Sequence, residues 1–354
     1  MTIETKYLKD DLDEVVSLAY IDLKTLEGSR LLITGGTGFV GKWLLYSLLN
    51  FHLQTQIKFE IIVISRNPEK FIEENPSLNN KLFRYIRSSI EDVQAAQKHI
   101  GSFDYLIHAA TEAGVNPVDI NLKDVLNTVV DGTFAIHELA GISGCKRSLN
   151  ISTGAVYGPQ PSDMERLNED YLGGPNPLDV QTSYHHTKRL AEFIAIDRAK
   201  LHSFEVVTAR LFAFLGPYLP IDSYFAAGNF IRDAITRKPI TINGDGRPIR
   251  SYQYPVDLVT WLVGMLARGA NGEAYNVGSS QDTSLLDLAE RITNLSGNND
   301  AVVVLGKSST NLAGLRYVPD ISKAELQLQL KNSVSLDDAI MRTIKWHRSV
   351  GISL

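Results

Sequence analysis

A tyrosine and a lysine four residues apart are the first residues of this sequence that could do chemistry. Tyr184 and Lys188 lie in "YHHTK", inside the helical pattern "SYHHTKRLAEFIAIDRAKLH", and residues four apart share one face of a helix. A phenol with an ordinary pKa of about 10 is a poor base at neutral pH. A neighbouring ammonium stabilises the phenolate, so the pair can move a proton at a substrate hydroxyl. Thr153, at the end of the predicted strand "KRSLNISTGAVYG", can supply a hydroxyl that bonds the same substrate oxygen.

Three glycines mark the turn between the first predicted strand and the helix that follows it. Gly35, Gly38 and Gly41 form G-x-x-G-x-x-G within "RLLITGGTGFVGKWLLYSLLN". Such a turn lets the backbone approach a pyrophosphate, and the free N–H groups of the helix N-terminus bind the anion. We expect Phe39 and Val40 to belong to this site. The pattern predicts a dinucleotide cofactor.

The end of the second predicted strand, "FEIIVISRN", bears on which dinucleotide binds. An acid commonly stands there and binds the hydroxyls of the adenosine ribose, but this sequence has Ser65 and Arg66. An arginine can bind a 2′-phosphate, and the missing acid removes a repulsion against it. The sequence therefore favours NADP. The alternative is that Arg66 stacks on the adenine and NAD binds.

Short apolar strands alternate with helical patterns over the first 215 residues. This alternation predicts an α/β protein with a Rossmann-type, doubly wound parallel sheet. After that the loops lengthen, and amphipathic helices such as "LLDLAERITNLS" predict a smaller α/β C-terminal portion that binds substrate. The predicted units are an N-terminal helical extension (1–27), a dinucleotide-binding domain (28–212 and about 250–270), and a mainly substrate-binding portion (213–354) interleaved with it.

Composition limits the remaining possibilities. A formal net charge of −5 argues against nucleic acid or an anionic membrane as the main partner. Cys145 is the only cysteine of the 354 residues, so we expect no internal disulfide, no metal–thiolate cluster and no metal. The start of the sequence lacks the apolar segment of a signal peptide, and no run approaches the ~18 apolar residues of a membrane span. We therefore expect a cytoplasmic protein.

Together these motifs resemble the extended short-chain dehydrogenase/reductase family, in its NAD(P)-dependent nucleotide-sugar epimerase/dehydratase group. The resemblance covers roughly residues 28–348 and rests on "TGGTGFVG", "IHAAT", "STGAVYG", "YHHTK", "LGP", "GDGRPIRSYQY" and "YNVGS". It implies a nucleoside-diphosphate sugar as substrate and Thr153, Tyr184 and Lys188 as the catalytic trio. It also implies a homodimer, because in related proteins two long helices such as those expected at 122–140 and 184–200 pair into a four-helix bundle.

The resemblance assigns further residues to the two ligands. His108, Ala109 and Ala110, at the edge of the fourth strand, are expected to line the cofactor. The residues expected at the substrate are Thr111, Glu112, Thr153, Asn229, Arg250 and Arg316. Of these, Arg250 would contact the diphosphate and Arg316 would be a second phosphate contact. The structural alternatives are a surface arginine at 250 and a helix cap at 229.

Two departures from the family pattern affect the expected reaction. Family members often carry an asparagine three residues after the arginine that occupies position 210, and this sequence has Ala213 there. In the 4,6-dehydratases of the group an Asp–Glu pair follows the catalytic threonine and carries protons during elimination. Gly154 and Ala155 have no side-chain group that can donate or accept a proton, although Glu112 could take that role.

These departures favour an epimerase that acts through a transient 4-keto sugar, with Tyr184 as acid and base. The alternatives are a nucleotide-sugar 4-ketoreductase, which an NADP site would fit, and a 4,6-dehydratase with displaced acids. A more remote alternative is a dinucleotide-binding sensor without turnover, against which the intact trio argues.

Overall fold

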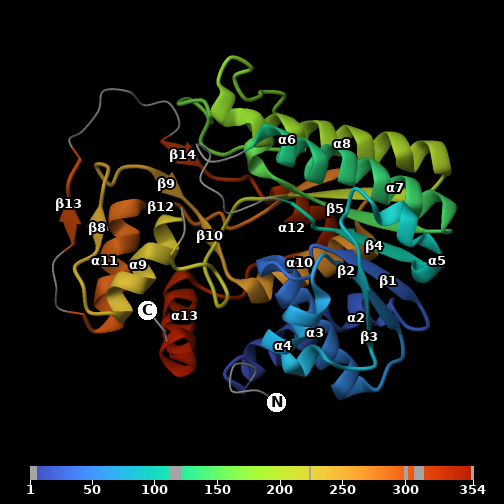
Figure 1. The fold of residues 1–354 in the computed structure, drawn as a ribbon. Helices are drawn as coiled ribbons and strands as arrows, with labels where there is room; N and C mark the ends of the chain where they lie inside the picture. The colour runs from blue at the N-terminus through green and yellow to red at the C-terminus, as the bar shows by residue number, and fades with distance from the viewer. Residues whose placement is uncertain (1–5, 112–120, 223–224, 299–301, 307–314, 352–354) are drawn as a thin grey trace.

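A seven-stranded parallel sheet forms the centre of the computed structural model, which describes residues 6–111, 121–222, 225–298, 302–306 and 315–351 (Figure 1). Its strand order is β11-β6-β5-β4-β1-β2-β3, and every neighbouring pair is parallel. The strands are β1 (Arg30–Thr34), β2 (Glu60–Ser65), β3 (Phe83–Arg87), β4 (Tyr105–His108), β5 (Arg147–Thr153), β6 (Glu205–Leu211) and β11 (Ala274–Val277). The predicted doubly wound fold is confirmed, and its order reverses between β1 and β4, where such sheets bind ligands.

Continuous apolar runs explain why these segments lie in the middle of the sheet. Strand β2 is buried at every residue after the first, as expected for a parallel strand that is covered on both faces. Because side chains alternate along a strand, Leu31 and Ile33 pack into one core and Leu32 packs into another. The helices that cover the two faces are α2 (Lys9–Lys24), α3 (Phe39–Thr55) and α10 (Pro255–Arg268) on one side, and α7 (Gly132–Ile142) and α8 (Ser183–His202) on the other (Figure 1).

Helix α2 packs on the body of the molecule, against α3 and α10. Asp11 accepts a hydrogen bond from the Tyr254 hydroxyl at 2.6 Å and another from Arg342 at 2.8 Å. Asp22 forms an ion pair with Arg268, with a nitrogen–oxygen distance of 2.7 Å. The N-terminal helix is thus attached to the chain through both α10 and the last helix.

Within the described residues, the C-terminal portion includes three helices that pack together and three small sheets. Helices α9 (Ala226–Ile235), α11 (Leu285–Ser296) and α13 (Leu336–Val350) contact one another. The small sheets have the orders β12-β9-β14, β10-β7 and β13-β8. Their strands are β7 (Ala213–Phe214), β8 (Thr241–Ile242), β9 (Ile249–Arg250), β10 (Tyr252–Gln253), β12 (Thr283–Ser284), β13 (Val303–Val304) and β14 (Arg316–Tyr317). The other α-helices are α4 (Pro68–Glu74), α5 (Gln97–Ile100), α6 (Leu122–Val125) and α12 (Ser322–Leu328), and a π-helix spans Leu126–Asp131.

Two searches of the described residues gave negative results. No helix among them has both the length and the apolar character needed to cross a membrane. No three histidine, cysteine, aspartate or glutamate side chains among them are grouped so that they could hold a metal ion.

Candidate active site

The glycine turn between β1 and α3 is packed so tightly that two of its glycines have no room for a side chain, whether or not a ligand is bound. Gly35 has a φ of +68°, and a Cβ there would lie 2.4 Å from the carbonyl of Ala109. A Cβ on Gly41 would lie 2.3 Å from the carbonyl oxygen of Gly35. At Gly38 the nearest atom would be 3.5 Å away, so packing alone does not require a glycine there.

The third glycine and the start of α3 together fit a pyrophosphate. Gly38 caps α3 without a side-chain hydrogen bond, and the Lys42 N–H donates to its carbonyl at 2.8 Å. The N–H groups of Phe39, Val40 and Gly41 precede that first helical bond, as at every helix N-terminus. Because Gly38 has no side chain, the space in front of these donors stays open to an anion. The turn therefore has the shape and the donors that a dinucleotide needs.

Ser65 and Arg66 lie at the carboxyl end of β2, beside the glycine turn. Ser65 is buried, and its hydroxyl accepts a hydrogen bond from the Asn67 N–H at 3.3 Å. Arg66 is exposed. The structure thus places a cation, and no acid, directly after the carboxyl end of β2.

The histidine at the end of β4 has its ring turned into the core. The His108 ring is buried between the hydroxyls of Thr34 and Thr133, with its nitrogens 2.8 and 3.0 Å from them. Burial holds the pKa of His108 well below its ordinary value, so the ring is neutral. Both ring nitrogens are used in the core, so any part of His108 at the cofactor would be its backbone, and the expected cofactor contact stays a prediction. The residues that adjoin the glycine turn are Ala109 and Ala110.

The three residues of the expected trio come from β5 and the start of α8. Lys188 is 3% exposed, and its Nζ donates to the carbonyl of Ile151 at 2.7 Å. The hydroxyl of Thr111, just after β4, donates to the Tyr184 hydroxyl at 3.5 Å. Thr153 ends β5, where its Oγ1 accepts from the Ala155 N–H at 3.2 Å. Strand β5 therefore carries both the threonine and the carbonyl that anchors the lysine.

Burial acts on the two titratable members of this trio in opposite directions. It raises the pKa of Tyr184, against the effect of the Thr111 hydrogen bond. It lowers the pKa of Lys188 to about 8, while the negative charge of Glu192 opposes that shift. In this state the phenol holds its proton firmly, so its use as a base depends on positive charge placed beside it.

Replacing Lys188 with methionine is expected to change how stability depends on pH. The pKa of about 8 for Lys188 in the folded protein lies below the value of about 10.4 for an exposed lysine, so the unfolded chain binds more protons between these values. The free energy of unfolding of the wild type should therefore rise through this range relative to Lys188→Met. Urea denaturation at several pH values measures the difference, with Lys200→Met on the exposed side of α8 as control. A difference that stays constant with pH would contradict the assignment.

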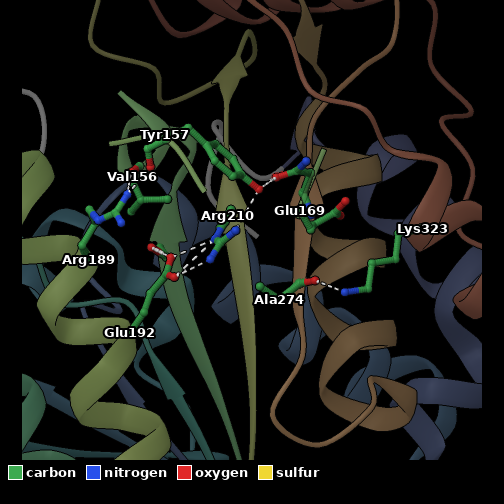
Figure 2. Close-up of polar contacts among 11 residues, drawn as sticks. Val156, Tyr157, Glu169, Arg189, Glu192, Arg210, Ala274 and Lys323 are labelled. Carbon is green, nitrogen blue, oxygen red and sulfur yellow. Dashed lines mark hydrogen bonds and ion pairs between the residues drawn. The ribbon is translucent and has the colours of Figure 1, made fainter. Parts of the chain in front are cut away.

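A buried polar network is centred on Arg210 and Glu192 (Figure 2). Arg210, on β6, donates to both carboxylate oxygens of Glu192, and its Nη1 donates to the Tyr157 hydroxyl at 2.9 Å. Glu192 also accepts from the Ser152 hydroxyl. Tyr157 in turn donates to Asn276 at 2.8 Å. The network ties helix α8 to β5, β6 and β11 and so fixes the position of the helix that carries Tyr184 and Lys188.

Tyr317, which the sequence analysis missed, lies at the same strand end as Thr153. The Tyr317 hydroxyl lies beside Gly154, the residue that follows Thr153. The Tyr317 ring packs on Phe212, with ring centroids 4.6 Å apart. A Cβ added at Gly154 would lie 2.6 Å from Phe212 and 2.7 Å from the Tyr317 hydroxyl. Gly154 is therefore enclosed, and a longer side chain has no room there.

Arg250 is the other residue that the C-terminal portion brings near Tyr317. Strands β9 and β14 pair Arg250 with Tyr317, and the guanidinium lies over the Tyr317 ring, 5.9 Å from its centroid. One of its nitrogens, Nη1, donates to the carbonyls of Ile249 and Leu315. The Arg250 side chain is thus held by the backbone beside the phenol that lies at Gly154.

The remaining expected substrate residues have other partners or are not described. Arg316 pairs with Asp282 and donates to the carbonyl of Glu165, at the wall of a cavity of about 480 Å³ that Arg247 also lines. The side-chain oxygen of Asn229, on α9, accepts from Arg232 at 3.1 Å. Glu112 lies outside the described residues. No contact among the described residues joins Arg316 or Asn229 directly to the trio.

Comparison with known proteins shows which family and which solved structures this chain resembles. The sequence matches the model of the "NAD dependent epimerase/dehydratase family" over residues 31–278. UDP-glucuronic acid decarboxylase 1 from Arabidopsis thaliana is 29% identical over 322 residues, which are 90% of this chain and 70% of that protein. A solved UDP-glucuronic acid 4-epimerase variant from Bacillus cereus, in complex with UDP-4-deoxy-4-fluoro-glucuronic acid and NAD, is 26% identical. Its TM-score is 0.77, and the match covers 91% of this chain and all (100%) of that one.

A second solved structure supports the fold. UDP-glucose 4-epimerase from Thermotoga maritima, solved with UDP-glucose, matches 91% of this chain and 99% of its own with a TM-score of 0.78. Its sequence identity is 21%, so this likeness concerns the arrangement of helices and strands alone.

Proposed function

Because this chain belongs to the NAD dependent epimerase/dehydratase family, we propose that it is a nucleotide-sugar epimerase that works through a transient 4-keto sugar. Tyr184 is the acid and base of this reaction. The observation that carries the proposal is the enclosed Gly154, which leaves no room for an elimination acid beside an intact Thr153, Tyr184 and Lys188.

The proposed reaction begins with a proton transfer at the sugar 4-hydroxyl. Tyr184, as phenolate, takes this proton, and the hydroxyl of Thr153 bonds the same oxygen as it becomes a carbonyl. Lys188, one helical turn from Tyr184, stabilises the phenolate by its charge. When bound, NAD(P) supplies the hydride acceptor for C4 and later the hydride donor. Tyr184 then returns its proton to the oxygen after the 4-keto sugar has turned its other face.

Replacing Gly154 with alanine is expected to destabilise the protein by about 1–3 kcal/mol, the usual cost of overpacking a filled site. The added Cβ would meet the Phe212 ring and the Tyr317 hydroxyl, both closer than 3 Å. Urea denaturation measures the cost, and Gly244→Ala, where a Cβ meets nothing within 4 Å, is the matched control. Equal stability of the two variants would show that Gly154 has room for a side chain, and would remove the argument against an acid there.

A sugar linked to a nucleoside diphosphate is the proposed substrate. Arg250 has a fixed position beside Tyr317, and a guanidinium binds phosphate oxygens with two parallel hydrogen bonds. The names of the decarboxylase relative and of the Bacillus cereus epimerase share UDP-glucuronic acid. We therefore propose UDP-glucuronic acid as the first substrate to test.

A 4-ketoreductase is the second candidate, and the end of β2 favours it. Arg66 and the absence of an acid there suit the 2′-phosphate of NADP, a cofactor that reductases exchange at every turnover. The same Thr153, Tyr184 and Lys188 would serve this reaction in one direction.

One set of assays separates these possibilities. The purified protein is denatured gently and any retained dinucleotide is identified by mass spectrometry, and native protein is incubated with UDP-glucuronic acid without added cofactor. Retained NAD(H) or NADP(H) with formation of the C4 epimer supports the epimerase. Release of carbon dioxide supports a decarboxylase, because a 4-keto uronic acid is a β-keto acid. A protein that retains no dinucleotide and consumes a 4-keto sugar nucleotide only with added NADPH supports the reductase.

We also propose that the enzyme is a homodimer that pairs through α7 and α8. Both helices carry large apolar side chains that are exposed in the single chain, with Phe193 at 67%. The exposed apolar residues on these helices are Phe134, Ile142, Leu190, Phe193, Ile196 and Leu201. An apolar face of this kind is typical of a protein–protein interface. Sedimentation equilibrium tests the proposal, and a monomer at micromolar concentration would contradict it.

A further inference from the structure

His108 lies at the centre of a chain of hydrogen bonds that begins beside the glycine turn. The Ala110 N–H donates to Thr34 Oγ1 at 3.3 Å, and Thr34 Oγ1 lies 2.8 Å from His108 Nδ1. On the other side of the ring, His108 Nε2 lies 3.0 Å from Thr133 Oγ1. Thr133 in turn donates to the carbonyl of Val129, which belongs to the π-helix. The three side chains of this chain are each 1% exposed, so it runs entirely through the core.

The protons of this chain have one consistent arrangement. A threonine hydroxyl has one proton and a carbonyl can only accept, so the proton of Thr133 goes to Val129. His108 Nε2 therefore carries the proton that Thr133 accepts. The ring is neutral, because burial holds the pKa of His108 well below its ordinary value, and Nδ1 is bare. Thr34 thus donates to Nδ1 and accepts from the Ala110 N–H.

Thr34 is the residue through which this arrangement reaches the glycine turn. It ends β1 directly before Gly35. Its carbonyl accepts from the Ala109 N–H at 3.1 Å, and its hydroxyl accepts from the Ala110 N–H. The peptide between Ala109 and Ala110 packs on Gly35, where an added Cβ would lie 2.4 Å from the Ala109 carbonyl and 2.6 Å from the Ala110 nitrogen. Because close-packed groups transmit small shifts, the orientation of the Thr34 hydroxyl determines how the turn lies against the end of β4.

A second buried histidine of the same core offers a comparison. His137, on α7, has its Nε2 3.1 Å from Ser148 Oγ. Ser148 is the second residue of β5 and pairs with Leu106, two residues before His108 on β4. The hydrogen bond between His137 and Ser148 is therefore as buried as those of His108 but lies outside the chain that reaches the turn.

We propose that His108, as its Nε2–H tautomer, is a positioning residue of the dinucleotide site, which orients the Thr34 hydroxyl so that the glycine turn fits the cofactor. This inference rests on the proposed function, because the ligand of the turn is the dinucleotide of that reaction. The imidazole does not need to touch the cofactor, since its effect passes through Thr34 and the peptide of Ala109 and Ala110.

The tautomer is tested on the wild-type protein. Proton–nitrogen correlation NMR of protein with ¹⁵N-labelled histidine distinguishes the two neutral tautomers, and His108→Asn identifies the signals of this ring. We expect the Nε2–H form at neutral pH. An Nδ1–H ring, or a mixture of the two forms, would overturn the proposed arrangement.

Two replacements of the ring test its role in binding. Asparagine can present an amide oxygen near the place of Nδ1, where it still accepts from Thr34, whereas glutamine presents its amide near the place of Nε2. Binding of NADH and of NADPH to the full-length variants, freed of any retained dinucleotide, is measured by the fluorescence of the reduced nicotinamide. The dissociation constant of the tighter dinucleotide is expected to rise about five- to tenfold in His108→Gln, the effect of one neutral hydrogen bond. In His108→Asn it should rise less than about twofold.

Thr34→Val and Ser148→Ala complete the test. Thr34→Val removes the hydroxyl and keeps the shape of the side chain, so it should weaken binding as much as His108→Gln, and it serves alone if His108→Gln does not fold. Ser148→Ala breaks the bond to His137 and should lower the thermal midpoint while the dissociation constant stays within about twofold of the wild type.

The outcomes separate this inference from the proposed function. If His108→Gln and Thr34→Val bind as tightly as the wild type, if His108→Asn and His108→Gln bind equally, or if Ser148→Ala weakens binding as much as Thr34→Val does, His108 is only a residue of the core. The inference is then wrong and the proposed function stands. If the wild type binds neither NADH nor NADPH, the dinucleotide site of the proposed function is wrong and the inference fails with it.

Discussion

Replacing Tyr184 with phenylalanine is expected to lower kcat about a thousandfold. The substitution removes the only phenol of α8 and with it the group that exchanges a proton with the sugar 4-hydroxyl, and proton transfer by a positioned side chain contributes about 10²–10⁴ to a rate. The KM for the sugar nucleotide should change little, because the ring remains and the contacts to the diphosphate are elsewhere. Steady-state kinetics with UDP-glucuronic acid measures both parameters.

Two controls accompany this prediction. Tyr20→Phe makes the same chemical change at an exposed tyrosine of α2, and its kcat should equal that of the wild type. Binding of the dinucleotide to Tyr184→Phe should persist, because the glycine turn is untouched. A Tyr184→Phe enzyme that keeps more than about a tenth of the wild-type kcat would show that another group moves the proton.

Replacing Arg210 with methionine is expected to destabilise the protein by about 3–5 kcal/mol, the cost of breaking a buried ion pair from one side. Arg210 supplies three hydrogen bonds to the Glu192 carboxylate, between 2.8 and 3.3 Å, and Glu192 is 9% exposed. Without the guanidinium, Glu192 is left buried with the Ser152 hydroxyl as its other hydrogen-bond partner. Urea denaturation measures the loss.

A surface ion pair and a double variant make this prediction specific. Arg291 pairs with Asp337 at 2.8 Å, but both side chains are more than 40% exposed, so Arg291→Met should cost no more than about 1 kcal/mol. Replacing Arg210 and Glu192 together, with methionine and leucine, should recover much of the loss, because no buried charge remains. Equal costs for Arg210→Met and Arg291→Met would contradict the role given to the buried pair.

The sheet and the glycine turn could be predicted because local physics determines them. A run such as "EIIVIS" is apolar throughout because β2 is covered on both faces, and Gly35 adopts a positive φ that other residues avoid. The burial of the His108 ring could also have been predicted from the sequence. Leu106 and His108 are two residues apart on β4, so they point to the same face, and Leu106 packs in the core that α7 covers.

Tyr317 and the pairing of Arg316 could not be predicted from the sequence. Strands β9 and β14 are two residues each and are paired across a long stretch of chain, so no periodicity indicates them. The family resemblance suggested a phosphate contact at Arg316, but Asp282 lies next to it only through the folding of the C-terminal portion. The proximity of Tyr317 to Thr153 likewise depends on where two portions of the chain meet.

The measurement that tests the central claim most directly uses UDP-glucuronic acid labelled with deuterium at C4. The sugar nucleotide is recovered after turnover in ordinary water and analysed by mass spectrometry and proton NMR. Hydride transfer through Tyr184 chemistry predicts a slower reaction than with unlabelled substrate and a product that keeps its deuterium at C4. Loss of the label to water would show that C4 is deprotonated rather than oxidised by hydride transfer, and would contradict the account given for Thr153, Tyr184 and Lys188.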